Sequence, residues 1–84
     1  DLRVVSPLSG ILQLKKNKGT VLRVKSDTIP QGISFAYGYQ KYASDLVFKP
    51  EGRFYEAEIA GPEKKAEVLN LFYNLNGLAT YVLR

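Results

Sequence analysis

The last third of the chain, from residue 52 to 84, restricts the possible folds more than any other stretch. Within residues 62–76, large apolar side chains recur at i, i+3, i+4 and i+7, which places them on one face of an α-helix. Pro62 suits the first helical position, and Gly61 and Gly77 suit the two ends. The spacing predicts a helix at 62–76 between strands at 53–59 and 78–83. The apolar residues on its inner face would be Val68, Leu71, Phe72 and Leu75.

Residues 11–16 and 20–26 predict a β-hairpin around the loop Asn17-Lys18-Gly19, with Gly19 in the left-handed conformation. A loop of this length would pair Leu14 with Leu22 and Leu12 with Val24, so that the large apolar residues share one face.

Further strands are expected at 33–40, where alternation is strict, and at 46–48. The turn at 49–52 allows two registers. We favour the one that pairs Leu46 with Tyr55, because it collects apolar side chains on one face.

These elements predict an α+β fold. It would be an antiparallel sheet of about five to six strands, in the order β-β-β-β-β-α-β, with one C-terminal helix packed on one face. The chain of 84 residues is short enough to form a single domain, 1–84. Ile33, Phe35, Tyr37 and Tyr39 form a stripe that either fills the core or faces a partner. We favour the core, because large apolar residues are more often buried than displayed.

Composition argues against most catalytic chemistry. The chain has no histidine and no cysteine, which removes the usual catalytic triads and the usual zinc, copper and haem ligands. Its glycines lack the spacing of a phosphate-binding loop. Asp45, Glu56 and Glu58 could share a sheet face, but alternating carboxylates are typical of a solvated strand. We therefore expect no enzyme, no cofactor and no bound metal.

Charge is unevenly distributed along the chain. The net charge is +4, and the segment from Arg3 to Lys25 has six basic residues and no acidic one. Such a segment indicates either an anionic partner or a solvated lysine-rich hairpin. Its basic side chains could combine with tyrosines from the next strand, with the tyrosines stacking on bases and the cations following phosphates. The candidate partner-binding residues are Lys15, Arg23, Lys25, Tyr37, Tyr39, Lys41 and Tyr42.

The expected element order, strands followed by a helix, resembles that of small single-strand-binding modules of the Whirly and Pur-alpha families. The resemblance implies binding of single-stranded nucleic acid, but no motif matches residue by residue, so no family site is carried over.

We expect a non-catalytic binding or assembly module that recognises another protein, or a second copy of itself, through a sheet face or edge. The uncharged closing strand at 78–83 is one candidate edge. The alternative is single-stranded nucleic-acid binding through the basic hairpin and the tyrosine-rich strand. No apolar run is long enough to span a membrane. Because the chain begins at Asp1 and lacks methionine, we expect a processed chain or an excised domain, and its compartment is undetermined.

Overall fold

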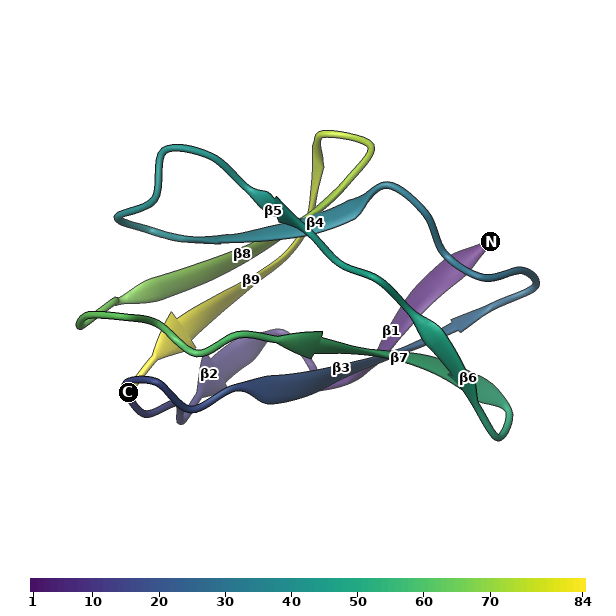
Figure 1. The fold of residues 1–84 in the computed structure, drawn as a ribbon, viewed down its shortest axis with the longest axis horizontal. Coiled ribbons are helices and arrows are strands. Elements are labelled where there is room, and N and C mark those ends of the chain that lie inside the picture. Colours follow the sequence, from purple (N-terminus) through teal and green to yellow (C-terminus); the bar gives the residue numbers. More distant parts are fainter.

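The chain folds into β-strands alone, so the prediction of an α+β fold with a C-terminal helix is wrong (Figure 1). The computed structural model describes all residues, 1–84. None of them forms an apolar helix of membrane-spanning length. The nine strands are β1 (Leu2–Ser6), β2 (Gly10–Leu12), β3 (Thr20–Ser26), β4 (Ile33–Tyr37), β5 (Ser44–Asp45), β6 (Lys49–Glu51), β7 (Phe54–Ile59), β8 (Val68–Tyr73) and β9 (Asn76–Leu83).

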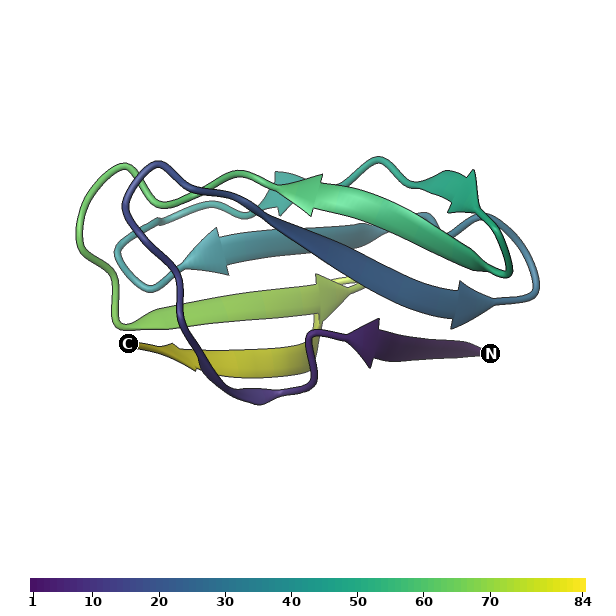
Figure 2. The same cartoon turned by 90° about the horizontal axis from the view of Figure 1, so that it is seen from below.

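The strands form two sheets packed face to face (Figure 2). Sheet A has the order β1-β3-β7-β6, and sheet B has the order β2-β9-β8-β4-β5. All pairs are antiparallel except β2 with β9, which are parallel. This is the strand order of an immunoglobulin-type sandwich. The chain lacks the inter-sheet disulfide and the tryptophan of antibody domains, and the fold by itself assigns no function.

The segment predicted to be helical is a loop followed by strand β8. In β8, Leu69 and Leu71 point inward and are fully buried, whereas Val68 and Phe72 alternate to the outer face. Leu75 lies in the turn after the strand and is exposed, so only one of the four residues expected to be buried, Leu71, is in the core. The helical spacing was real, but β8 obtains hydrogen-bond partners on both sides, from β4 and β9. This long-range pairing outweighs the local pattern.

The predicted hairpin of 11–16 with 20–26 is also wrong. The strand β3 spans the expected residues, with Leu22 and Val24 inward, but its neighbours are β1 and β7. The strand β2 belongs to the other sheet and pairs Ile11 with Val82 of β9. The loop between β2 and β3 therefore crosses from sheet B to sheet A (Figure 2). Its left-handed residue is Asn17, with φ of 60°, instead of Gly19.

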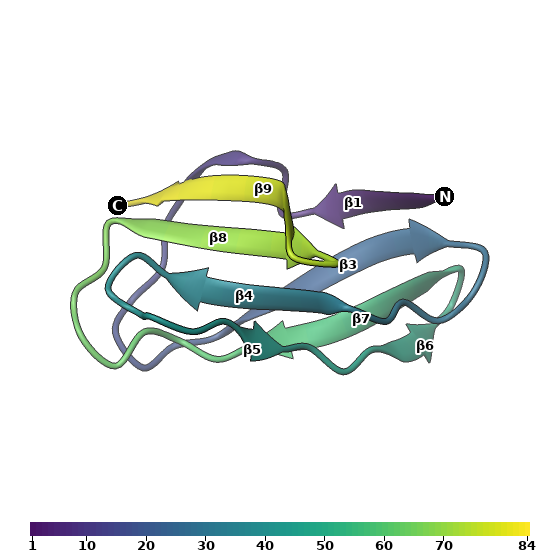
Figure 3. The same cartoon turned by 90° about the horizontal axis from the view of Figure 1, so that it is seen from above.

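The chain also crosses from sheet B to sheet A between β5 and β6 (Figure 3). Here the favoured pairing of Leu46 with Tyr55 is wrong, because Pro50 of β6 lies opposite Tyr55. The expected strand at 46–48 is instead the crossing segment, and its Leu46 and Phe48 side chains are buried in the core.

One core of twelve buried residues lies between the sheets. The favoured burial of the aromatic stripe is confirmed for Ile33, Phe35 and Tyr37, while Tyr39 is half-buried at the edge of the core. The core residues are Leu22, Val24, Ile33, Phe35, Tyr37, Leu46, Phe48, Ala57, Ile59, Leu69, Leu71 and Tyr81.

Candidate functional site

Two of the seven candidate partner-binding residues have structural contacts that occupy their rings. Tyr37 is 2% exposed, and its hydroxyl donates a hydrogen bond to the carbonyl oxygen of Ala60. The ring of Tyr39 stacks on that of Tyr37, with centroids 6.2 Å apart. The hydroxyl of Tyr39 accepts a hydrogen bond from the backbone N–H of Glu63, and the Lys64 ammonium lies 4.8 Å from the Tyr39 ring centroid. Neither ring is a free platform for a base.

Two others, Arg23 and Lys25, lie on the outer face of sheet A. Arg23 donates a 2.7 Å hydrogen bond from Nε to the Glu56 carboxylate, and its guanidinium lies over the Phe54 ring. Lys25 lies opposite Arg3 of β1. This face carries charges of both signs, and its Arg23 already has an anionic partner in Glu56.

The last three, Lys15, Lys41 and Tyr42, are exposed in loops. The loops that follow β2 and β4 lie at the end of the molecule where the chain terminates (Figure 1). Lys15 is in the loop after β2, and Lys41 and Tyr42 follow β4. The structure therefore separates the seven residues into a core pair, a pair on sheet A and a group at one end. It does not bring them together as one surface.

The three acidic residues considered for a metal site come from different sheets and line one groove, but they do not form a cluster of metal ligands. Asp45 belongs to β5 in sheet B, whereas Glu56 and Glu58 belong to β7 in sheet A. The Glu56 carboxylate is bound by Arg23. The structure contains no group of three acidic side chains that could hold a metal ion.

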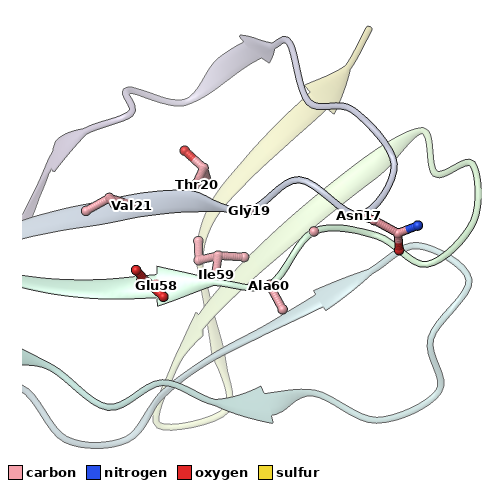
Figure 4. Close-up of a pocket in the computed structure, with 8 residues that line it drawn as sticks. Asn17, Gly19, Thr20, Val21, Glu58, Ile59 and Ala60 are labelled. Carbon is pink, nitrogen blue, oxygen red and sulfur yellow. The ribbon is translucent and has the colours of Figure 1, made fainter.

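A hollow of about 550 Å³ lies where the start of β3 meets the end of β7 (Figure 4). The two backbones approach closely at Gly19, where a Cβ would lie 2.6 Å from the carbonyl oxygen of Ile59. Glu58 is the only ionisable side chain in its lining. The hollow offers no pair of groups for acid–base or nucleophilic chemistry.

The outer face of sheet B carries no charged side chain on strands β2, β9, β8 and β4. In this it differs from the outer face of sheet A. Along its first row, Ile11 of β2, Val82 of β9 and Val68 of β8 are neighbours, and Ile11 is 68% exposed. Because an exposed row of this kind costs free energy in water, it is typical of a contact surface. The outward positions are Ile11, Val82, Thr80, Val68, Asn70, Phe72, Ser34 and Ala36.

A shallow hollow of about 300 Å³ marks this face, because the outward residues of β4 are small. Ser34 and Ala36 form part of its floor, and the larger Phe72 stands beside it. Leu75, in the turn between β8 and β9, also lines the hollow and is 91% exposed. Its φ of 70° lies in the left-handed region, which is unfavourable for a bulky side chain. A protruding strained leucine beside a hollow is the most unusual local feature of the molecule.

The closing strand, considered as a free edge, lies inside sheet B between β2 and β8. However, β2 covers only the stretch from Tyr81 to Leu83, so the first part of β9 is paired on the β8 side alone. In sheet A, β6 likewise stops opposite Glu56 and leaves the end of β7 paired only with β3.

Comparisons of the chain with protein-family models, with curated proteins and with solved structures find no match.

A signal for the uncharged face was present in the sequence. The sixteen residues from Val68 to Leu83 contain no charged side chain, and neither do the twelve from Ile29 to Gln40. These two runs supply β8, β9 and β4. Because the first run was predicted to be partly helical, the absence of charge from both faces of these strands was not recognised.

Proposed function

We propose that this chain is a non-catalytic recognition module that binds another protein through the outer face of sheet B. The observation that carries the proposal is the absence of charge from the outward positions of β2, β9, β8 and β4, next to the projecting side chain of Leu75. Charged residues are depleted at the centres of protein interfaces, so such a face suits an uncharged partner surface.

Energetics support a contact at Leu75. A leucine that is almost fully exposed gains no burial energy in the free chain, and its left-handed backbone adds a cost of about 1–3 kcal/mol. A partner that covers Leu75 and places a side chain in the neighbouring hollow would recover the burial energy. The volume of the hollow, about 300 Å³, is large enough for one large apolar side chain.

The edge of sheet A is a weaker candidate. A groove of about 730 Å³ runs beside β7, and Val47, which is 86% exposed, lies along it. Its rim carries Asp45, Glu58 and Lys49. Charged side chains at a strand edge are the usual means by which proteins prevent pairing with another strand.

A pair of variants separates the face from the edge. Leu75→Glu and Val47→Glu each place a carboxylate at a loop residue of nearly equal exposure, so both chains should fold. We expect Leu75→Glu to weaken partner binding at least about tenfold, or 1.4 kcal/mol, and Val47→Glu to leave it within about twofold.

The measurement is the affinity for each protein recovered by cross-linking, together with sedimentation velocity for self-association. If only Val47→Glu lost affinity for the partner, the contact would be assigned to the edge of sheet A. An equal loss of affinity in both variants would contradict specific binding through the outer face of sheet B. A dimer that dissociates in Leu75→Glu would identify the partner as a second copy.

A further inference from the structure

The net positive charge of the molecule is concentrated at one end. Three loops and the end of β9 meet there and carry seven basic residues with two acidic ones, Glu63 and Glu67. The rest of the chain carries five basic and six acidic residues and is nearly neutral. The seven basic residues are Lys15, Lys16, Lys18, Lys41, Lys64, Lys65 and Arg84, and all are exposed.

Backbone contacts fix two of these loops against each other. The N–H of Asn17 donates a 2.8 Å hydrogen bond to the carbonyl oxygen of Pro62. Gly61 lies directly against the backbone of Lys18, where a Cβ would overlap it. The end of the chain is held by a bond from the N–H of Arg84 to the carbonyl oxygen of Leu12. The lysines therefore project from a rigid frame, which lowers the entropy lost on binding.

Between these segments lies a pocket of about 550 Å³. Four cations line it, Lys16, Lys64, Lys65 and Arg84, against the single carboxylate of Glu67. Its floor is apolar, with Leu14, Ala66 and Leu83 among the residues that form it. A concave site with apolar walls and one sign of charge concentrates ions of the opposite sign.

We propose that this pocket binds the phosphodiester backbone of a single-stranded nucleic acid, with neighbouring bases held by the apolar floor and by Tyr42. Lysine ammonium groups act as point charges toward phosphates. Tyr42 lies outside the pocket lining, three residues after Tyr39, whose ring is approached by the Lys64 ammonium of the pocket. It is 75% exposed, with the Lys41 ammonium 5.6 Å from its ring centroid. Cations combined with an exposed aromatic ring are the usual elements of single-strand binding. The pocket shares no lining residue with the hollow beside Leu75, although Lys41, which approaches the Tyr42 ring, also lines that hollow.

A charge-matched pair of triple variants tests the site. Lys16→Ala/Lys64→Ala/Lys65→Ala removes three cations from the pocket. Arg3→Ala/Lys25→Ala/Arg53→Ala removes three from a second cluster, which also contains Asp1 and Asp27. Both variants have the same net charge, and all six residues are exposed, so circular dichroism should show the same fold.

The probe is a fluorescein-labelled oligothymidylate, and its anisotropy is measured over a series of salt concentrations. We expect the pocket variant to bind at least about tenfold more weakly. The slope of log K against log salt should be shallower by about 2, for three lost phosphate contacts. The control variant should change affinity less than about threefold, and Tyr42→Ala should weaken binding with the slope unchanged.

An equal loss of oligothymidylate affinity in the two triple variants would overturn the assignment of the site. Failure of the wild type to bind the oligothymidylate at low salt would also overturn it. A heparin-type sulfated oligosaccharide that competes more strongly than the oligonucleotide at equal charge would overturn the assignment to nucleic acid. Leu75→Glu should leave oligonucleotide binding unchanged, so failure of this proposal and failure of the protein-recognition proposal are distinguishable.

Discussion

The hydroxyl of Tyr37 donates a 2.7 Å hydrogen bond to the carbonyl oxygen of Ala60, which joins β4 of sheet B to the segment that leaves β7 of sheet A. Tyr81 makes a comparable bond of 2.6 Å to the carbonyl oxygen of Pro7. Burial raises the pKa of both hydroxyls. For Tyr37 it raises the pKa to about 12, and Tyr39 adds to the increase. The sandwich is thus held together in part by two tyrosine hydroxyls that must stay protonated.

The first prediction concerns alkaline stability. Because the pKa of Tyr37 is about 12 in the folded chain and 10.0 ordinarily, its contribution to stability is complete below pH 10 and is lost as pH rises toward 12. We expect the urea midpoint of the wild type to fall more steeply across this window than that of Tyr37→Phe. At neutral pH, Tyr37→Phe should be less stable by about 1 kcal/mol, for the lost hydrogen bond. Parallel pH profiles for the two chains would contradict the assignment.

The second prediction tests β8 as a strand. Alternation places Leu71 in the core and Phe72 on the outer face. Leu71→Ala should therefore lower the free energy of unfolding by about 2–5 kcal/mol, and Phe72→Ala by less than about 1.5 kcal/mol. The measurement is equilibrium urea unfolding. A helix with both residues on its inner face would make the two losses similar, so comparable values would argue against the strand.

The third prediction concerns the contact between the loops at the basic end. A Cβ on Gly61 would overlap the backbone of Lys18, whereas one on Gly77 would meet nothing within 4 Å. Gly61→Ala should lower the free energy of unfolding by about 1–3 kcal/mol, because a backbone segment has to move. Gly77→Ala is the matched control and should change stability little. If both glycines tolerate alanine equally, the loops are not in contact.

The fourth prediction concerns the ion pair of Arg23 with Glu56, which lies on the partly exposed outer face of sheet A. A double-mutant cycle with alanine at both positions should give a coupling energy below about 1 kcal/mol that decreases with added salt. A larger coupling that salt does not reduce would mean that the pair is shielded from solvent, contrary to its position.

The fifth prediction separates strain from binding at Leu75. Glycine adopts a φ of 70° freely, so Leu75→Gly should raise the free energy of unfolding by about 1 kcal/mol. Leu8→Gly is the control, since Leu8 is also exposed but has no positive φ, and it should lower stability slightly. A loss of stability in Leu75→Gly would show that the leucine contributes to the fold, which would remove the argument that it serves a partner.

Several features of the fold were accessible from the sequence because they depend on neighbours along the chain. Alternation located β3 and β7 almost to the residue, and it identified Leu22 and Val24 as inward-facing. Strict alternation in the segment starting at Ile33 also placed its aromatic side chains on one face, and their size favoured burial of that face. A two-residue period is specified locally, so a short window suffices to detect it.

Strand partners were not accessible in this way. The residues that form β2 and β3 pair with β9, β1 and β7, which lie elsewhere in the sequence, and a plausible turn at Asn17 to Gly19 suggested a hairpin that does not form. The same applies to the candidate surfaces. Lys16 meets Lys64, and Ile11 meets Val82, only because distant segments are adjacent in the sandwich.

The sequence by itself determined which residues are apolar, where alternation occurs and which chemistries are missing, since these are properties of single residues and short windows. Only the tertiary structure decided that residues 68–73 form a strand, because an apolar run with both periodicities adopts the conformation whose hydrogen bonds and burial its neighbours complete. The same pairing decided which residues form the uncharged outer face of sheet B.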